Sequence, residues 1–239
     1  MNVNGSKHWL HTASTSQWTY FTCHKKRGKE ATDTAGVLPN YQGVLVHDHW
    51  KPCFKYECLH ALCNAHHVRE LEFALDKEEQ RWAKELQELL FDIQKEVEDA
   101  GGRLSYQRIK ARLKQYRQII KEGELECPEP PREQGKRGRV KKSKSRNLLE
   151  RLRDYEKEVL RFMINPDVPF TNNLAENDIR MTKVHQKISG CFRSIEGAEN
   201  FCAIRSYVSS CRKQNITAST ALNLLFSGHL PDIFIQKAE

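Results

Sequence analysis

The sequence predicts an α/β fold, and two patterns predict it. Short runs rich in aromatic and β-favouring residues occupy the first part of the chain, and longer segments with apolar residues at helical spacing fill most of the remainder. At 239 residues the chain can form one large domain, or a domain that carries a substantial insertion.

The first expected strands form a hairpin. Residues 9–12 and 18–22 are rich in aromatic and β-favouring side chains, and the polar stretch 13–17 between them suits a hairpin loop. After a run of turn residues, the apolar segment 44–47 is typical of a short buried strand. Asp48 follows this segment directly, so we expect its carboxylate at the carboxyl end of the strand.

Helices are expected in the middle of the chain. Residues 61–75 contain neither glycine nor proline, and residues 77–100 carry apolar side chains at helical spacing with charged residues between them. Gly101 and Gly102 should end that helix, and a second amphipathic helix is expected over 104–121. The two amphipathic helices predict a helical hairpin that packs on the rest of the protein.

A break and then further helices are expected in the second half. Residues 127–146 combine prolines, glycines and basic residues, which indicates a linker or an exposed loop. Helices are expected again over 147–163 and 174–184, and residues 171–173 offer an N-cap to the second of these. Closing helices are expected over 200–239.

The net charge of +8 favours a polyanionic partner. There are 39 Lys and Arg against 31 Asp and Glu, and each phosphate that a basic residue neutralises releases a condensed counterion. The basic run 132–146, with Arg139, Lys141 and Lys142 among its possible donors, either contacts the DNA backbone or is a solvated linker. No apolar run is long enough to span a membrane, and the eight cysteines are most simply reduced thiols in a cytoplasm.

Asp48 and Glu176 are the acidic residues most suited to metal chemistry. A carboxylate at a strand end and another on a helix can be held rigidly together, and such hard oxygen ligands suit Mg²⁺. Two ions held in this way can activate a water or a 3′-hydroxyl and stabilise the leaving oxygen. The alternative is that both residues are ordinary surface acids among the 31 of the chain.

Five segments around these residues resemble the transposases of insertion-sequence family 66, a bacterial DDE group with a ribonuclease-H-like core. They occur in the expected order and cover nearly the whole chain. The segments are Asn4-Gly5 with His8-Trp9-Leu10-His11, GVLVHD at 43–48, CNAHHVREL at 63–71, NNLAENDIR at 172–180, and SGCFRS at 189–194 with Gly197-Ala198.

The resemblance implies Mg²⁺- or Mn²⁺-dependent cleavage and transfer of DNA strands at transposon ends. Asp48 would be the second metal-binding acid and Glu176 the third, and His66 would be an accessory residue near the metal or the scissile phosphate. Arg180, Lys183, Lys187 and Arg193 would contact DNA phosphates. The alternative for Arg180 is a salt bridge to Glu176 across one helical turn.

The resemblance also implies a division of the chain. A mixed sheet flanked by helices would form a ribonuclease-H-like core, interrupted by an all-helical insertion and followed by a short helical carboxyl-terminal element. The expected parts are 1–75 and 147–205 for the two pieces of the core, 76–146 for the insertion with its basic linker, and 206–239 for the carboxyl-terminal element.

One departure from the family pattern concerns its first aspartate. In the family this residue lies a few positions before the Val-Asn-Gly turn, whereas this sequence begins at Met1 directly ahead of Val3, and its earliest acidic residue is Glu30. We therefore expect an amino-terminally truncated copy, inactive alone, that holds Mg²⁺ weakly and leaves the strand at 44–47 with an unpaired edge. An intact transposase or a separately encoded amino-terminal part would be its partner. The alternative is a non-catalytic DNA-binding or regulatory remnant.

A cluster of cysteines and histidines offers two further interpretations. Four of the residues Cys53, Cys58, Cys63, His66 and His67 could hold structural zinc, although their spacing matches no standard finger. Cys63 and His67, one helical turn apart, could form a nucleophilic pair, but no orienting acid accompanies them. A buried apolar Cys63 is the simpler expectation.

Overall fold

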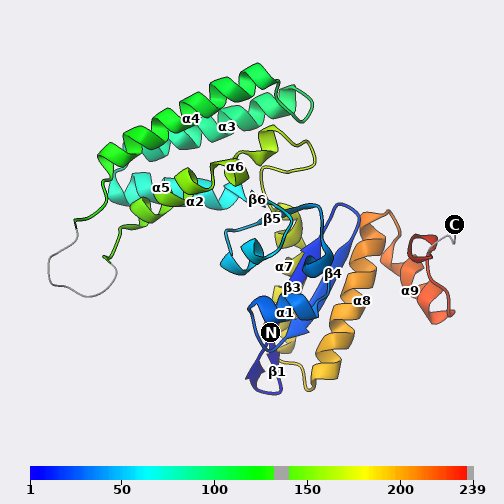
Figure 1. Ribbon diagram of the computed structural model, residues 1–239. Coiled ribbons are helices and arrows are strands. Elements are labelled where there is room, and N and C mark those ends of the chain that lie inside the picture. Colours follow the sequence, from blue (N-terminus) through cyan, green and yellow to red (C-terminus); the bar gives the residue numbers. More distant parts are fainter. Residues whose placement is uncertain (132–139, 236–239) are drawn as a thin grey trace. The chain divides into compact units, whose positions relative to one another are not determined.

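The structure is a computed structural model that describes residues 1–131 and 140–235, and the chain forms two compact units (Figure 1). One unit combines the two ends of the chain, Met1–Tyr41 and Asn173–Glu239, and we call it the hairpin unit. The other is the continuous segment Gln42–Asn172, which we call the helical unit. Each is described by itself.

The hairpin unit contains two short antiparallel pairs of strands and several helices. Its elements are β1 (Asn2–Val3), β2 (Ser6–Lys7), β3 (Trp9–Ser14), β4 (Thr19–His24), α1 (Lys29–Thr34), the 3-10 helix η1 (Leu38–Asn40), α7 (Asn173–Ser189), α8 (Ile195–Lys213), α9 (Ala218–Phe226) and the 3-10 helix η4 (Asp232–Phe234).

The centre of the hairpin unit is the pair β3–β4. The two strands run antiparallel in a register that places Trp9 opposite His24 and Ser14 opposite Thr19. Helix α7 packs on β3, and helix α8 packs on β4, as Figure 1 shows. Every second residue of β4 is buried, namely Thr19, Phe21 and Cys23. Because alternate side chains of a strand point to the same face, this face is the one covered by the helix. Phe21 and Cys23 form a small core together with Val3, Ala198 and Cys202.

The helical unit contains one parallel pair of strands and a larger set of helices. Its elements are β5 (Val44–His47), the 3-10 helix η2 (Lys51–Lys55), β6 (Leu59–Leu62), α2 (Asn64–Glu78), α3 (Arg81–Asp99), α4 (Tyr106–Glu126), α5 (Lys144–Asp154), α6 (Glu156–Val159) and the 3-10 helix η3 (Arg161–Met163).

A continuous apolar core holds the helical unit together. Trp82, Leu86, Leu90 and Ile93 are fully buried along one face of α3, and Tyr116 of α4 is also fully buried and donates a hydrogen bond of 2.8 Å to the carbonyl of Leu152. These positions recur at helical spacing, so the amphipathic pattern of the sequence does mark the buried face. Helices α3 and α4 lie side by side in Figure 1.

The helical ends are stabilised by side chains from distant positions. The carboxylate of Glu126, at the end of α4, accepts hydrogen bonds from the backbone nitrogens of Arg81 at 2.6 Å and Trp82 at 3.1 Å. These are backbone groups that the first turn of α3 cannot satisfy itself. The charge also lies at the positive end of the helix dipole, so the contact favours both partners.

The structure confirms several expected elements. The hairpin at the amino terminus, the strand before Asp48, and the end of a helix before Gly101 and Gly102 all occur. The strand at 44–47 is only half-buried apart from His47, so its expected full burial is wrong. One of its edges is paired in parallel with β6, from Val44–Leu59 to His47–Leu62, and among the described residues no strand pairs with its other edge, which agrees with the expected unpaired edge.

Other expectations differ from the structure in detail. The helix expected from residue 61 begins at Asn64, because residues 59–62 form β6. This helix, α2, continues to Glu78 and ends before Glu79, whose φ of 53° is left-handed. The helix expected over 147–163 is divided into α5, α6 and η3, and it starts within the expected linker.

The sequence predicts one mixed sheet, whereas the structure contains separate pairs of strands. Among the described residues, hydrogen bonds join the strands as β1–β2, β3–β4 and β5–β6. The protein is therefore a mixed α/β protein with small sheets, and the ribonuclease-H-like arrangement stays a prediction. The expected boundaries between parts of the chain, after residues 75, 146 and 205, lie inside the helices α2, α5 and α8, respectively. No helix among the described residues is long and apolar enough to cross a membrane.

Candidate active site

Asp48 lies where the sequence predicts it, directly after β5. Its neighbour His47 is the last residue of the strand and is buried, whereas Asp48 is exposed. His49 follows with a φ of 66°, a left-handed conformation that few residues other than glycine adopt. The chain therefore turns sharply after Asp48 and leaves its carboxylate at the end of the strand.

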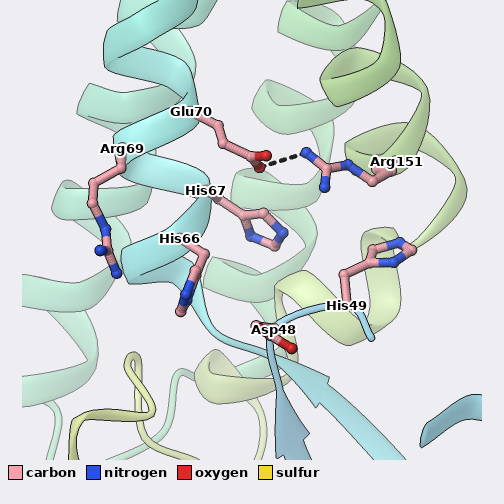
Figure 2. Close-up of a pocket in the computed structure, with 7 residues that line it drawn as sticks. All are labelled: Asp48, His49, His66, His67, Arg69, Glu70 and Arg151. Carbon is pink, nitrogen blue, oxygen red and sulfur yellow. Dashed lines mark hydrogen bonds and ion pairs between the residues drawn. The ribbon is translucent and has the colours of Figure 1, made fainter. Parts of the chain in front are cut away.

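A hollow of about 210 Å³ opens beside Asp48. Figure 2 shows side chains from three elements around it: the turn after β5, the first two turns of α2, and α5. The lining residues are Asp48, His49, His66, His67, Arg69, Glu70 and Arg151. The pocket thus combines carboxylates, imidazoles and guanidinium groups within the helical unit.

His67 is the most buried of these side chains, with 3% of its surface exposed. Its Nδ1 lies 3.1 Å from Oδ1 of Asn64, while Nδ2 of Asn64 donates to the carbonyl of Val159 at 3.0 Å. Because this second bond fixes Oδ1 as an acceptor, Nδ1 of His67 must carry the proton. The Nε2 atom is then an unprotonated nitrogen, available as an acceptor or a metal ligand.

Burial determines the charge state of His67. Burial, and then the nearby Arg151, lower the pKa of His67 to about 3. Burial and Arg151 also lower the pKa of His49 below its ordinary value. A buried imidazole loses hydration when it is charged, so His67 is neutral at physiological pH.

Arg151 and Glu70 form an ion pair at the pocket, drawn as a dashed line in Figure 2. The pair joins α5 to α2 through one terminal nitrogen of the Arg151 guanidinium group. The Nε atom of Arg151 and the Nε2 atom of His49 are both buried and have no hydrogen-bond partner among the described residues. Both atoms can therefore bond a polar group that enters the pocket.

Glu176, the second predicted acid, lies in the first turn of α7 in the hairpin unit. It is exposed, as are Arg180, Lys183 and Lys187 on the same helix. Spacings of four, seven and eleven residues place all four on one face of α7. Asp48 belongs to the helical unit. The pairing of Asp48 with Glu176 therefore stays a prediction, whereas Asp48 and His66 do line one pocket.

The other predicted DNA contacts have different surroundings. Arg193 is exposed just before α8, and Lys141 is exposed just before α5. Lys142 is largely buried, and its Nζ lies 2.8 Å from Glu129 and 2.6 Å from Glu150. Because two carboxylates already surround this ammonium group, we do not carry Lys142 forward as a phosphate contact. Arg139 lies outside the described residues.

The cysteine and histidine cluster does not form a zinc site of the kind considered. Within the described part of the chain, no three of Cys53, Cys58, Cys63, His66 and His67 bring ligand atoms within 4.8 Å of one another. Burial raises the pKa of the Cys53 thiol to about 12. Cys63 is buried, as expected, and its Sγ accepts a hydrogen bond from the backbone nitrogen of Asn172 at 3.1 Å.

Sequence reasoning missed several of the interactions at the pocket. Asn64 and His67 were not predicted to act together, although an asparagine one turn before a histidine on a helix is a usable signal. Arg151 and Glu70 are 81 positions apart, and no local pattern connects them. For the pair of Cys63 and His67 considered as a nucleophile, the structure shows other partners: Nδ1 of His67 is bonded to Asn64, and the Cys63 sulfur accepts from the backbone of Asn172.

Comparison with known proteins gives one match. The family model described as "Transposase IS66 family" matches residues 1–200. No curated protein and no solved structure matches the chain. The matched region includes the pocket at Asp48 and all of α7.

Proposed function

The chain belongs to the IS66 family of transposases, and from this premise we propose that it acts in DNA transposition by metal-dependent cleavage and transfer of DNA strands. We propose Asp48 and Glu176 as carboxylate ligands of the cation. The observation that carries the proposal is the exposed carboxylate of Asp48, held at a strand end beside a pocket with unused polar atoms.

The donor set at the pocket fits a divalent cation. Asp48 offers the hard oxygen ligands that Mg²⁺ or Mn²⁺ takes in proteins, and the exposed position leaves room for the waters that Mg²⁺ retains. When bound at such carboxylates, a pair of cations activates the attacking hydroxyl and stabilises the leaving oxygen. The neutral His67 in the same pocket adds no positive charge that would repel a cation.

Several exposed basic groups fit a phosphate backbone. Arg180, Lys183 and Lys187 follow Glu176 along one exposed face of α7, and Arg193 and Lys141 are also exposed. At the pocket, Nε of Arg151 has no hydrogen-bond partner within the part of the chain that the structure describes, and we propose it as a donor to a phosphate oxygen. His66, which lines the same pocket, is proposed as an accessory residue that orients the scissile phosphate.

A strand-transfer assay with matched variants tests the proposal. The chain is incubated with DNA carrying the ends of the element and Mg²⁺ or Mn²⁺, and nicked and joined products are measured. Asp48→Asn and Glu176→Gln remove one charge each at nearly constant shape. We expect each to lower product formation by at least about a hundredfold, since each removes a metal ligand. Glu196→Gln, which changes an exposed acid of α8, is the control.

The outcomes separate the two functions considered. Loss of product with Asp48→Asn and Glu176→Gln, but not with Glu196→Gln, supports the metal-dependent enzyme. DNA binding that weakens with salt, with no product from the unmodified chain, supports the non-catalytic DNA-binding function instead. Product formation that is unchanged in both variants overturns the assignment of the two acids.

A further inference from the structure

A polar network in the hairpin unit surrounds Asp178, two residues after Glu176 on α7. One oxygen of Asp178, Oδ2, accepts hydrogen bonds from Ser14 Oγ at 2.7 Å and from Thr19 Oγ1 at 3.0 Å. The same oxygen lies 2.7 Å from Nζ of Lys213. Three donors from β3, β4 and α8 therefore converge on a single carboxylate oxygen of α7.

Lys213 connects this carboxylate to the loop of the hairpin. Its ammonium group also donates to the backbone carbonyls of Thr15 at 2.9 Å and Trp18 at 3.2 Å. The side chains of Lys213 and Asp178 are only 12% and 15% exposed. An ion pair with this little exposure and several additional hydrogen bonds is screened less than a surface pair, and it holds a defined geometry.

The network fixes the rotation of α7 about its axis. Positions 176 and 178 differ by about 200° around a helix of 3.6 residues per turn. When Asp178 faces the hairpin, Glu176 must face away from it, and so must Arg180 and Lys183. The buried Thr182, one turn after Asp178, confirms which side of α7 faces inward.

We propose that Asp178 and Lys213 are positioning residues for Glu176: their ion pair sets the direction in which the face of α7 with Glu176 and the basic residues points. The proposal rests on the proposed function, in which Glu176 is a metal ligand. Neither residue touches the cation or the DNA. Their effect acts through the orientation of the helix, as partners behind a metal ligand usually do.

The affinity for Mn²⁺, measured by electron paramagnetic resonance, tests this role in the full chain. Asp178→Asn keeps the shape of the side chain but removes its charge, and Lys213→Met removes the ammonium group. We expect each to weaken Mn²⁺ binding by about tenfold, the lower end of the range for groups that orient a metal ligand. Lys213→Arg should restore most of the affinity, because a guanidinium can still donate to Asp178 and the loop.

Stability and positioning are separated by further variants. Ser14→Ala deletes one of the three donors and should give a smaller loss of affinity in a folded protein, which keeps the test valid if Lys213→Met unfolds. Circular dichroism and thermal melting show which variants are folded at the temperature of the binding measurement. Glu196→Gln is the control for a carboxylate outside the network.

Two results would overturn the proposal in different ways. If folded Asp178→Asn and Lys213→Met bind Mn²⁺ as tightly as the unmodified chain while Glu176→Gln does not, the network has no positioning role and the proposed function stands. If Glu176→Gln also binds Mn²⁺ normally, Glu176 is not a ligand, and the proposed function and this inference both fail. Weaker binding in the network variants, with rescue by Lys213→Arg, supports the inference.

Discussion

The two units of the protein are stabilised by different kinds of contact. The helical unit buries many large apolar side chains in one core, including Trp82, Leu90 and Tyr116. The hairpin unit has a small core around Phe21, and polar groups make many of its contacts between elements. Ser206 and Ser210 of α8, for example, bond the backbone of β4. The proposed metal ligands are divided between the units, Asp48 in one and Glu176 in the other.

One part of the chain therefore depends on buried apolar area, and the other depends on the geometry of its hydrogen bonds. Apolar burial is nondirectional and tolerates small displacements, whereas a hydrogen bond weakens steeply when its angle or length changes. Substitutions should therefore have different signatures in the two units, and hydrogen exchange can report on each unit separately.

The largest effect is expected in the core of the helical unit. Trp82→Ala removes a side chain that is 1% exposed and packs close to Gly123. The free energy of unfolding should fall by about 3–5 kcal/mol, because the change loses apolar burial and leaves a cavity. Denaturant titration measures this loss, and hydrogen exchange should place it in α3 and α4. Phe226→Ala, at a site that is 86% exposed, is the control; equal losses in both variants would contradict the prediction.

Acid should destabilise the helical unit next most strongly. Burial lowers the pKa of His67 from 6.5 to about 3 and that of His47 to about 4. The unfolded chain therefore binds protons below pH 6.5 that the folded chain does not, so stability is complete above this pH and falls as pH decreases toward the folded values. Each histidine contributes a slope of up to about 1.4 kcal/mol per pH unit.

Unfolding titrations between pH 7 and 4 measure this slope. His67→Gln should make the slope shallower, since the amide does not titrate, although its lost contact lowers stability at every pH. His229→Gln, at an exposed position of the hairpin unit, is the control for the loss of a histidine. An identical pH dependence in His67→Gln and the unmodified chain would show that His67 is not held neutral.

A smaller effect is expected where the hairpin unit depends on a hydroxyl. Ser210 Oγ accepts from the backbone nitrogen of Thr19 at 3.0 Å and lies 3.2 Å from its carbonyl, and both residues are buried. Ser210→Ala should lower the free energy of unfolding by about 1–3 kcal/mol, because the backbone nitrogen loses its partner. Hydrogen exchange should show faster exchange at Thr19, and Ser209→Ala is the control. Unchanged exchange at Thr19 would mean that water replaces the hydroxyl.

The smallest effect is expected for a surface ion pair of α3. Lys84 and Glu88 lie 3.9 Å apart, and their side chains are 61% and 64% exposed. Lys84→Ala should change the free energy of unfolding by no more than about 0.5 kcal/mol, because water and salt screen such a pair. A loss above about 1 kcal/mol, measured by denaturant titration, would mean that the comparison between apolar and polar contributions needs revision.

Local patterns predicted those elements whose causes are local. The hairpin loop, the amphipathic helices and the position of Asp48 after an apolar run could all be predicted from neighbouring residues. Strand β6 could not, since Leu59, His60, Ala61 and Leu62 include no β-branched residue, and only pairing with β5 makes them a strand. The break between α2 and α3 was expected at residue 76 and occurs at Glu79, because no glycine marks its left-handed conformation.

The site follows the same rule. The position of Asp48 after a strand and of the basic residues on one face of α7 could be predicted from motifs and spacing, and the roles of these residues and of His66 stay predictions. The neutral state of His67 could not, because it depends on Val159 and Arg151, which are far away in the sequence. The same holds for Asp178, whose three donors come from positions 14, 19 and 213. Contacts of this kind are produced by tertiary structure alone.

The discontinuous hairpin unit has a consequence for how the protein is made. Its first strands leave the ribosome long before α7 and α8, because the whole helical unit lies between them in the chain. At roughly 5–20 residues per second, the amino-terminal strands would wait on the order of ten seconds for the helices that cover them. During this interval their open edges are available to chaperones, or to another nascent chain.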